Sequence, residues 1–197
     1  MKRSALSFLL VFIGIAVGRL TTNASVFAQT GHDAGTPVPP TPSTTETVPE
    51  GQPRYLAAMR EELSAMGIAD AVCEATDAQR AHCHLTQEGS ATNRAYAVHL
   101  AYSDVTDTIY AYVDRYLVAT SDNAHTDVLM RRLMELNWTM LLGKFEWDPT
   151  DGEVRLAMVM NTDSNFDRRT FRSTVRTLTS IADRHVGELN RLYETGR

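Results

Sequence analysis

The 197-residue sequence contains only two cysteines, Cys73 and Cys83, and only two of its 19 basic residues are lysines. It lacks the Gly-x-Ser-x-Gly and His-Glu-x-x-His motifs that mark common hydrolases. The Gly-x-x-x-x-Gly-Lys and Gly-x-Gly-x-x-Gly loops that hold nucleotide phosphates are absent as well. We therefore expect neither an enzyme nor a nucleotide-binding protein, and we expect no cofactor.

The single long apolar run lies near the N-terminus, at residues 5–18, and ends at Arg19. A membrane-spanning helix needs about 20 apolar residues, so this run is short for an anchor and is typical of a signal peptide. Val26 and Ala28 occupy the two specificity positions of a cleavage site. We expect a signal peptide over residues 1–28 and a periplasmic or secreted protein, with an uncleaved anchor as the alternative.

Residues 29–53 are rich in proline, threonine and glycine and contain almost no large apolar side chain. Such a segment buries too little surface to offset its loss of conformational entropy, so we expect a disordered linker. Removing residues 1–28 takes away three basic residues and no acidic residue, which changes the net charge from −5 to −8. A negative chain disfavours binding to nucleic acid or to anionic membranes. Residues 54–197 suit one domain with a single core.

Hydrophobic periodicity predicts the secondary structure of this domain. Helices are expected at residues 54–67, at residues 126–137 with Asn137 at the exit, and from an N-cap at Ser164 or Asn165 onward. Strands are expected at residues 82–87, 94–103, 108–119, 143–148 and 152–160. The predicted class is α+β, with an antiparallel five-stranded sheet and three helices in two layers, in the order α-β-β-β-α-β-β-α.

Two stretches resemble the YbjN domain family, which is related in fold to type III secretion chaperones. The first is "LMELNWTMLLGKFEWDPTDGEVRLAM" at residues 133–158, and the second is "FRSTVRTLTSIADRHVGEL" at residues 171–189. The resemblance implies an α-β-β-β-α-β-β-α fold that often forms dimers and binds other proteins rather than catalysing a reaction.

The cysteines and three histidines are candidate site residues. In an exported protein an even number of cysteines favours a disulfide, here between Cys73 and Cys83. His82 and His84 would point to the same side of a strand, with His99 on a neighbouring strand as a third ligand for zinc or copper. Because the third ligand is uncertain, we expect no metal site and treat these histidines as weak candidates.

Tyr110, Tyr112 and Tyr116 alternate along one predicted strand and should form a stripe on one face. Tyrosine provides a large contact area with a polar tip, so the stripe is a candidate protein-binding surface or dimer interface. The alternative is that this face packs under a helix. His185, on the apolar stripe of the last helix, has no nucleophile in a recognisable motif and is expected to be structural.

Together these features predict an exported, non-enzymatic protein-binding or chaperone-like module. The expected partner is another protein, a second copy of this chain being one candidate. We expect no nucleic-acid partner and no membrane insertion after the signal peptide is cleaved. The alternative function is a periplasmic sensor domain that binds a small ligand or a metal.

Overall fold

The computed structural model describes residues 51–163 and 165–197. The predicted signal peptide and the predicted linker up to residue 50 lie outside this described part. The helices are α1 (Leu56–Ala65), α2 (Thr126–Thr139) and α3 (Arg168–Thr195), and the strands are β1 (Val72–Ala75), β2 (Arg80–Glu88), β3 (Ala95–Ser103), β4 (Thr108–Val118), β5 (Lys144–Trp147) and β6 (Glu153–Asn161). None of the described helices is long and apolar enough to cross a membrane.

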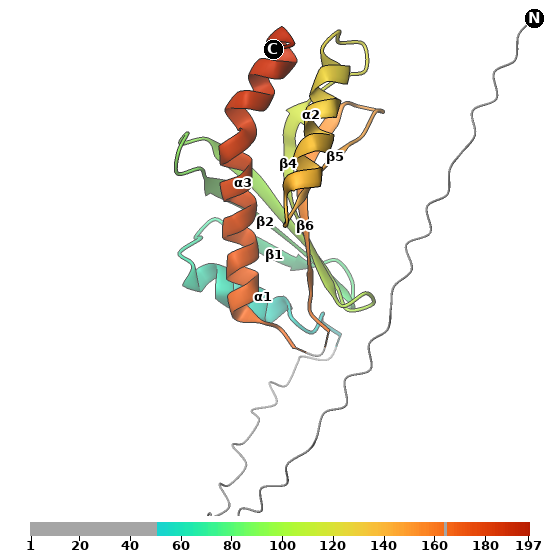
Figure 1. The fold of residues 1–197 in the computed structure, drawn as a ribbon. Coiled ribbons are helices and arrows are strands. Elements are labelled where there is room, and N and C mark those ends of the chain that lie inside the picture. The colour runs from blue at the N-terminus through green and yellow to red at the C-terminus, as the bar shows by residue number, and fades with distance from the viewer. Residues whose placement is uncertain (1–50, 164) are drawn as a thin grey trace, which may run out of the picture. The chain divides into compact units, whose positions relative to one another are not determined.

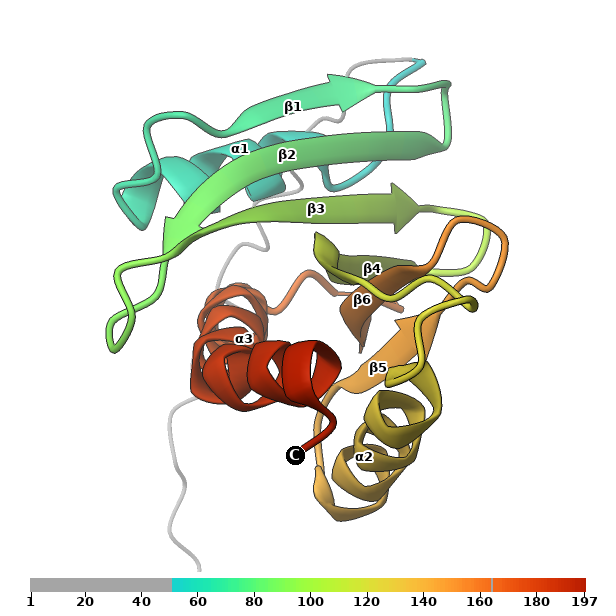
Figure 2. The ribbon, with the colours of Figure 1, turned by 90° about the horizontal axis from the view of Figure 1, so that it is seen from above.

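The six strands form one antiparallel sheet in the order β1-β2-β3-β4-β6-β5. The three helices lie along one side of this twisted sheet (Figures 1 and 2), so the fold has two layers. The predicted α+β class and the predicted antiparallel pairing are confirmed. The other face of the sheet carries no described helix.

The predicted number of strands is wrong, because β1 precedes the five expected strands. Only Cys73 of its four residues is buried, so the segment has no alternating apolar pattern to reveal it. Pairing with β2 makes it a strand, with Cys73 directly opposite Cys83. The extra strand lengthens the sheet at the β1 edge and leaves the rest of the predicted order unchanged.

The core lies between the sheet and the helices, and it is built from alternate residues of each strand. Cys83 of β2 pairs with Leu100 of β3, Leu100 pairs with Ala111 of β4, and Ala111 pairs with Met158 of β6. All four side chains are buried. They form one continuous apolar row across the sheet, which α3 covers through its contacts with β4 and β6.

A buried carboxylate fixes α1 to α3. Glu62 of α1 is only 2% exposed, and it accepts hydrogen bonds from Arg172 Nε and, at 2.7 Å, from Arg168 Nη1. These two guanidinium groups, Arg172 foremost, lower the pKa of Glu62 to about 2. Packing and a charge cluster therefore hold the two helices together.

The predicted exit of α2 at Asn137 is wrong, since the helix continues to Thr139. The side chain of Asn137 instead binds the backbone of the following strand. Its Nδ2 donates to the Phe145 carbonyl at 3.0 Å, and its Oδ1 accepts from the Phe145 N–H at 2.7 Å. Asn137 therefore anchors β5 to α2.

The predicted N-cap of α3 at Ser164 or Asn165 is also wrong, because Asp167 caps the helix. Asp167 Oδ1 accepts a hydrogen bond from Thr170 N at 3.0 Å. Phe166, just before the cap, packs on Phe171 in the first turns of the helix, with ring centroids 5.1 Å apart. This apolar contact across the cap fixes the entry angle of the chain and moves the start of the helix two to three residues further along.

Candidate protein-binding surfaces

The sheet face opposite the helices carries a row of aromatic rings. His82, His99, Tyr112 and Tyr110 follow one another across β2, β3 and β4, with 5.1 Å between ring centroids at each step. Arg155 of β6 lies over the Tyr112 ring at 5.0 Å from its centroid. All five side chains are half-buried, so the row forms a platform that stays partly exposed to solvent.

The hydroxyl of Tyr110 is already engaged. It donates a hydrogen bond to the Glu146 carboxylate, whose other oxygen lies 2.8 Å from Lys144 Nζ. Burial, and then this carboxylate, raise the pKa of Tyr110, so the phenol stays neutral. Contacts with β5 therefore fix the Tyr110 end of the platform.

Tyr116 does not belong to this platform, contrary to the predicted stripe. The register of β4 and β6 shifts between Val113 and Leu117, and Arg115 adopts a left-handed φ of 42°. This irregularity turns Tyr116 to the helix side, where it is 1% exposed and its hydroxyl donates to the Ala182 carbonyl of α3 at 2.9 Å. Tyr116 is a core residue.

The three candidate histidines lie on the same sheet face, but only two of them touch. His82 Nε2 is 3.2 Å from His99 Nδ1, whereas the rings of His84 and His99 are 6.5 Å apart between centroids. Burial lowers the pKa of His82, and the neighbouring His99 and His84 lower it further. Within residues 51–163 and 165–197, no group of three or more His, Cys, Asp or Glu side chains is arranged to hold a metal ion.

Cys73 and Cys83 are joined by a disulfide on the helix side of the sheet. Both residues are buried, and Arg60 of α1 donates two hydrogen bonds, at 2.6 and 3.1 Å, to the Cys73 carbonyl. The bridge therefore lies beneath α1 and joins β1 to β2. Its position indicates a structural role.

His185 lies beside α2 and β5, with Nδ1 3.9 Å from the Glu188 carboxylate and its ring edge-on to Phe145. Burial, as the main cause, lowers its pKa. In the described part of the chain, no hydroxyl or thiol is hydrogen-bonded to a histidine side chain. The arrangement that activates a nucleophile is therefore not formed around His185.

Asp183, a buried residue of α3, holds the β2–β3 loop against this helix. It is 5% exposed and accepts hydrogen bonds from Ala91 N at 2.6 Å, from the Thr92 hydroxyl and from Tyr96 Oη at 3.2 Å. Hydrogen bonds from Thr92 and Ala91 lower its pKa. Sequence reasoning missed this residue because its partners are some 90 positions away.

Sequence reasoning also missed an exposed apolar cluster at the end of α2 and in the loop before β5. The cluster comprises Met134, Trp138, Leu141 and Leu142, which are 72%, 90%, 96% and 52% exposed. Met134 and Trp138 are four residues apart and so share one face of α2. Monomeric proteins rarely expose contiguous apolar patches beyond a few hundred Å², and such patches commonly mark binding sites. The signal in the sequence was the run "WTMLL" at residues 138–142.

No protein-family model matches the chain, and no curated protein matches it. Among solved structures, it is similar to a chain of the crystal structure of the ExsC–ExsE complex, with 15% sequence identity and a TM-score of 0.47. The match covers 70% of this chain and 97% of that chain. A similarity at this level carries no conclusion about function, and the resemblance to the YbjN domain family stays a prediction.

Proposed function

We propose that this chain is an exported, non-enzymatic protein-binding module of the chaperone-like kind, and that it holds its partner at the apolar cluster. The observation that carries this proposal is the exposure of Trp138 and Leu141, at 90% and 96%. Covering one large apolar side chain stabilises a complex by about 1.5–3 kcal/mol. Tryptophan is also among the residues that most often dominate binding at protein interfaces.

Two further observations support the other parts of the proposal. The Cys73–Cys83 disulfide suits an oxidising compartment outside the cytosol. The histidines of the described part make no contact with a hydroxyl or thiol nucleophile, which favours a binding role over a catalytic one. The partner is another protein or a second copy of this chain, and the platform around Tyr112 offers it a second surface.

The alternative function, a periplasmic sensor for a small ligand or a metal, is favoured by one contact. His82 Nε2 and His99 Nδ1, 3.2 Å apart, could bind one transition-metal ion together. Calorimetric titration of the chain with Zn²⁺ tests this, with the His99→Asn variant as control. Binding that persists in His99→Asn would exclude the pair as the site.

The test of the main proposal is the solution mass of the chain, purified from its host under conditions that preserve complexes. We expect an assembly heavier than the 21.9 kDa of one full chain, with an N-terminus at residue 29. The Trp138→Asp and Leu141→Asp variants should be monomers. Val105→Asp is the matched control, because Val105 is 59% exposed in the β3–β4 turn, outside the cluster. A monomeric wild-type chain, indistinguishable from all three variants, would contradict the proposal.

A further inference from the structure

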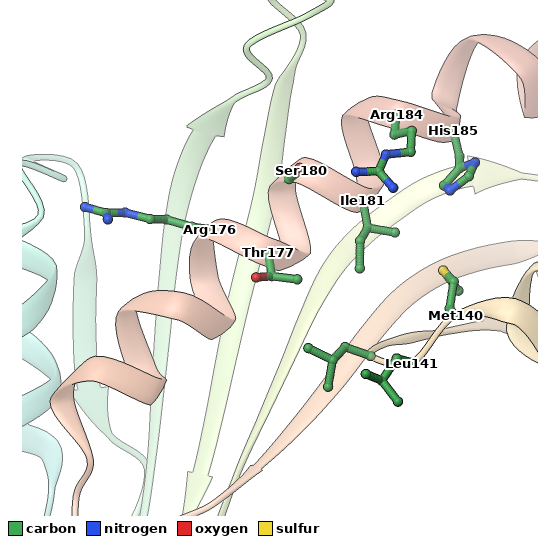
Figure 3. Close-up of a pocket in the computed structure, with 9 residues that line it drawn as sticks. Met140, Leu141, Arg176, Thr177, Ser180, Ile181, Arg184 and His185 are labelled. Carbon is green, nitrogen blue, oxygen red and sulfur yellow. The ribbon is translucent and has the colours of Figure 1, made fainter.

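A groove runs along α3 beside β6 and the loop that precedes β5. It consists of three adjoining hollows of about 510, 550 and 600 Å³, and Thr177 lines all three. Figure 3 shows one hollow, where Ile181 of α3 faces the loop residues Met140 and Leu141. The β6 hollow has an apolar floor that includes Leu142, which is 52% exposed, and the buried Met158 and Met160. Val159, which is 58% exposed, also lines the hollow at the strand edge, but it pairs with Tyr110 on the sheet face opposite the helices.

One side of β6 has a free backbone edge in this groove. β5 pairs with β6 from Trp147 opposite Val154 to Lys144 opposite Ala157, and no described strand pairs with the same side of β6 beyond that point. β6 continues to Asn161, with β4 on its other side throughout. A strand edge with unpaired N–H and C=O groups is a template for another extended chain.

Three arginines stand on the solvent-facing rim of the groove. Arg169, Arg176 and Arg184 are spaced by seven and eight residues, so they share one side of α3. All three are exposed, and none forms an ion pair with a carboxylate of the described residues. By contrast, the neighbouring Arg172 forms an ion pair with Glu62 of α1.

The placement of Arg169 is also unfavourable for the helix by itself. Arg169 lies in the first turn of α3, where the helix dipole favours negative charge. One carboxylate, Asp167, lines the same hollow; its oxygens accept hydrogen bonds from Thr170 N and Thr170 Oγ1, and its charge also interacts with that of Arg169. One carboxylate does not balance three arginines, and a basic rim of this kind on a chain of net charge −5 points to a ligand that brings negative charge.

We propose that this groove holds an extended acidic segment of a partner protein, added as a strand to the free end of β6. Carboxylates of the segment face Arg169, Arg176 and Arg184 on the helix side of the sheet, and its alternate apolar side chains lie on the opposite face beside Val159. A nucleic acid fits less well, because three arginines on an acidic chain give little counterion release and the floor is apolar. This inference rests on the proposed protein-binding function and names the chemistry of its partner.

The probe is a fluorescent, end-capped peptide of eight residues that alternates Glu and Val, titrated into the full chain and followed by anisotropy. We expect saturable binding that weakens with salt. Binding should be about tenfold weaker in the triple variant Arg169→Gln, Arg176→Gln, Arg184→Gln, which is the loss expected for three solvent-exposed ion pairs. Arg80→Gln, on β2 and away from the groove, is the control and should bind as the wild type does. Methylating alternate backbone nitrogens of the peptide should abolish binding.

Each of the following results would overturn the proposal. One is equal binding of a Lys-Val peptide, and another is an unchanged affinity in the triple variant. The third is tighter binding of an oligothymidylate, which would assign the groove to nucleic acid. The remaining candidate occupant is this chain's own N-terminal segment, which the double variant Glu46→Gln, Glu50→Gln tests. If the double variant binds the peptide several-fold more tightly than the wild type does, the groove belongs to that segment and the partner strand is refuted.

The Trp138→Asp variant separates this inference from the proposed function. Trp138 does not line the groove, so the variant should bind the peptide normally. If the chain binds the peptide and the Trp138→Asp variant has the same solution mass as the wild type, the proposed site at the apolar cluster is refuted and the groove is supported. If the assembly is lost in Trp138→Asp and the wild type does not bind the peptide, only the proposal for the groove is refuted.

Discussion

Replacing Glu62 by glutamine should destabilise the fold by weakening the contact between α1 and α3. Glutamine keeps the size of the side chain and removes its charge. Glu62 is 2% exposed and lies between Arg168 and Arg172, which are 40% and 46% exposed. The substitution leaves both guanidinium groups without their shared carboxylate, so the loss falls on one defined contact.

The structure sets the size of this loss. A pKa that falls from 4.5 to about 2 corresponds to about 3 kcal/mol in favour of the folded state, since one pKa unit is about 1.4 kcal/mol. Both arginines remain partly in water after the substitution, so solvent recovers part of that energy. We expect Glu62→Gln to lower the free energy of unfolding by about 2 kcal/mol, which is a fall in Tm of about 6 °C for a domain of this size.

The assay is thermal unfolding of the full chain followed by circular dichroism between pH 2 and pH 7. The folded-state pKa of Glu62 is depressed, so its contribution is fully present above pH 4.5 and is lost as the pH falls to about 2. The Tm difference between wild type and Glu62→Gln should therefore shrink over this window. Glu61→Gln is the control, because Glu61 is 63% exposed and, among the described residues, forms an ion pair with Arg168 alone. A Tm difference that is constant with pH, or equal in the two variants, would refute the reasoning.

Three other perturbations have defined outcomes. Reducing the Cys73–Cys83 bridge, or replacing both residues by serine, should lower Tm by about 10 °C, because a loop this short contributes about 3 kcal/mol. Gly89→Ala should cost about 2 kcal/mol in denaturant unfolding, since its Cβ would lie 2.0 Å from a carboxylate oxygen of α3. Gly187→Ala, with no atom within 4 Å of its Cβ, should be neutral or stabilising. The pKa of His82 is lowered from 6.5 in the folded protein, so the unfolded chain binds the proton more readily and the Tm of the wild type should fall as the pH drops from 7.5 to 5.5. The Tm of His82→Asn should fall less over the same range. An equal fall in both proteins would show that His82 is not the cause.

The sequence was informative wherever a hydrophobic pattern extended over a whole element. Alternation around Val98 and Val113 correctly predicted the β3–β4 hairpin, and the apolar stripe through Val175 and Leu189 correctly predicted α3. These patterns are local, and burial against the same core confirms each of them. The four residues of β1 carry no such pattern, and only pairing with β2 makes them a strand.

The candidate site was harder to predict, because exposure is set by tertiary packing. The bulge at Arg115 turns Tyr116 into the core, and an arginine with positive φ leaves no recognisable signal in the sequence. The run at residues 138–142 has the composition of a buried segment, yet Trp138 and Leu141 face the solvent. Composition alone does not reveal this exposure, because it follows from the position of the loop beyond the end of α2.

Photo-crosslinking in the living host tests the central claim most directly. A photoreactive amino acid would replace Trp138 in the full chain, and the same residue would replace Val105 in the control. We expect a protein adduct at position 138 that is absent at position 105, with mass spectrometry showing whether the adduct is a second copy or another protein. No adduct at position 138, or equal adducts at both positions, would contradict binding at the apolar cluster.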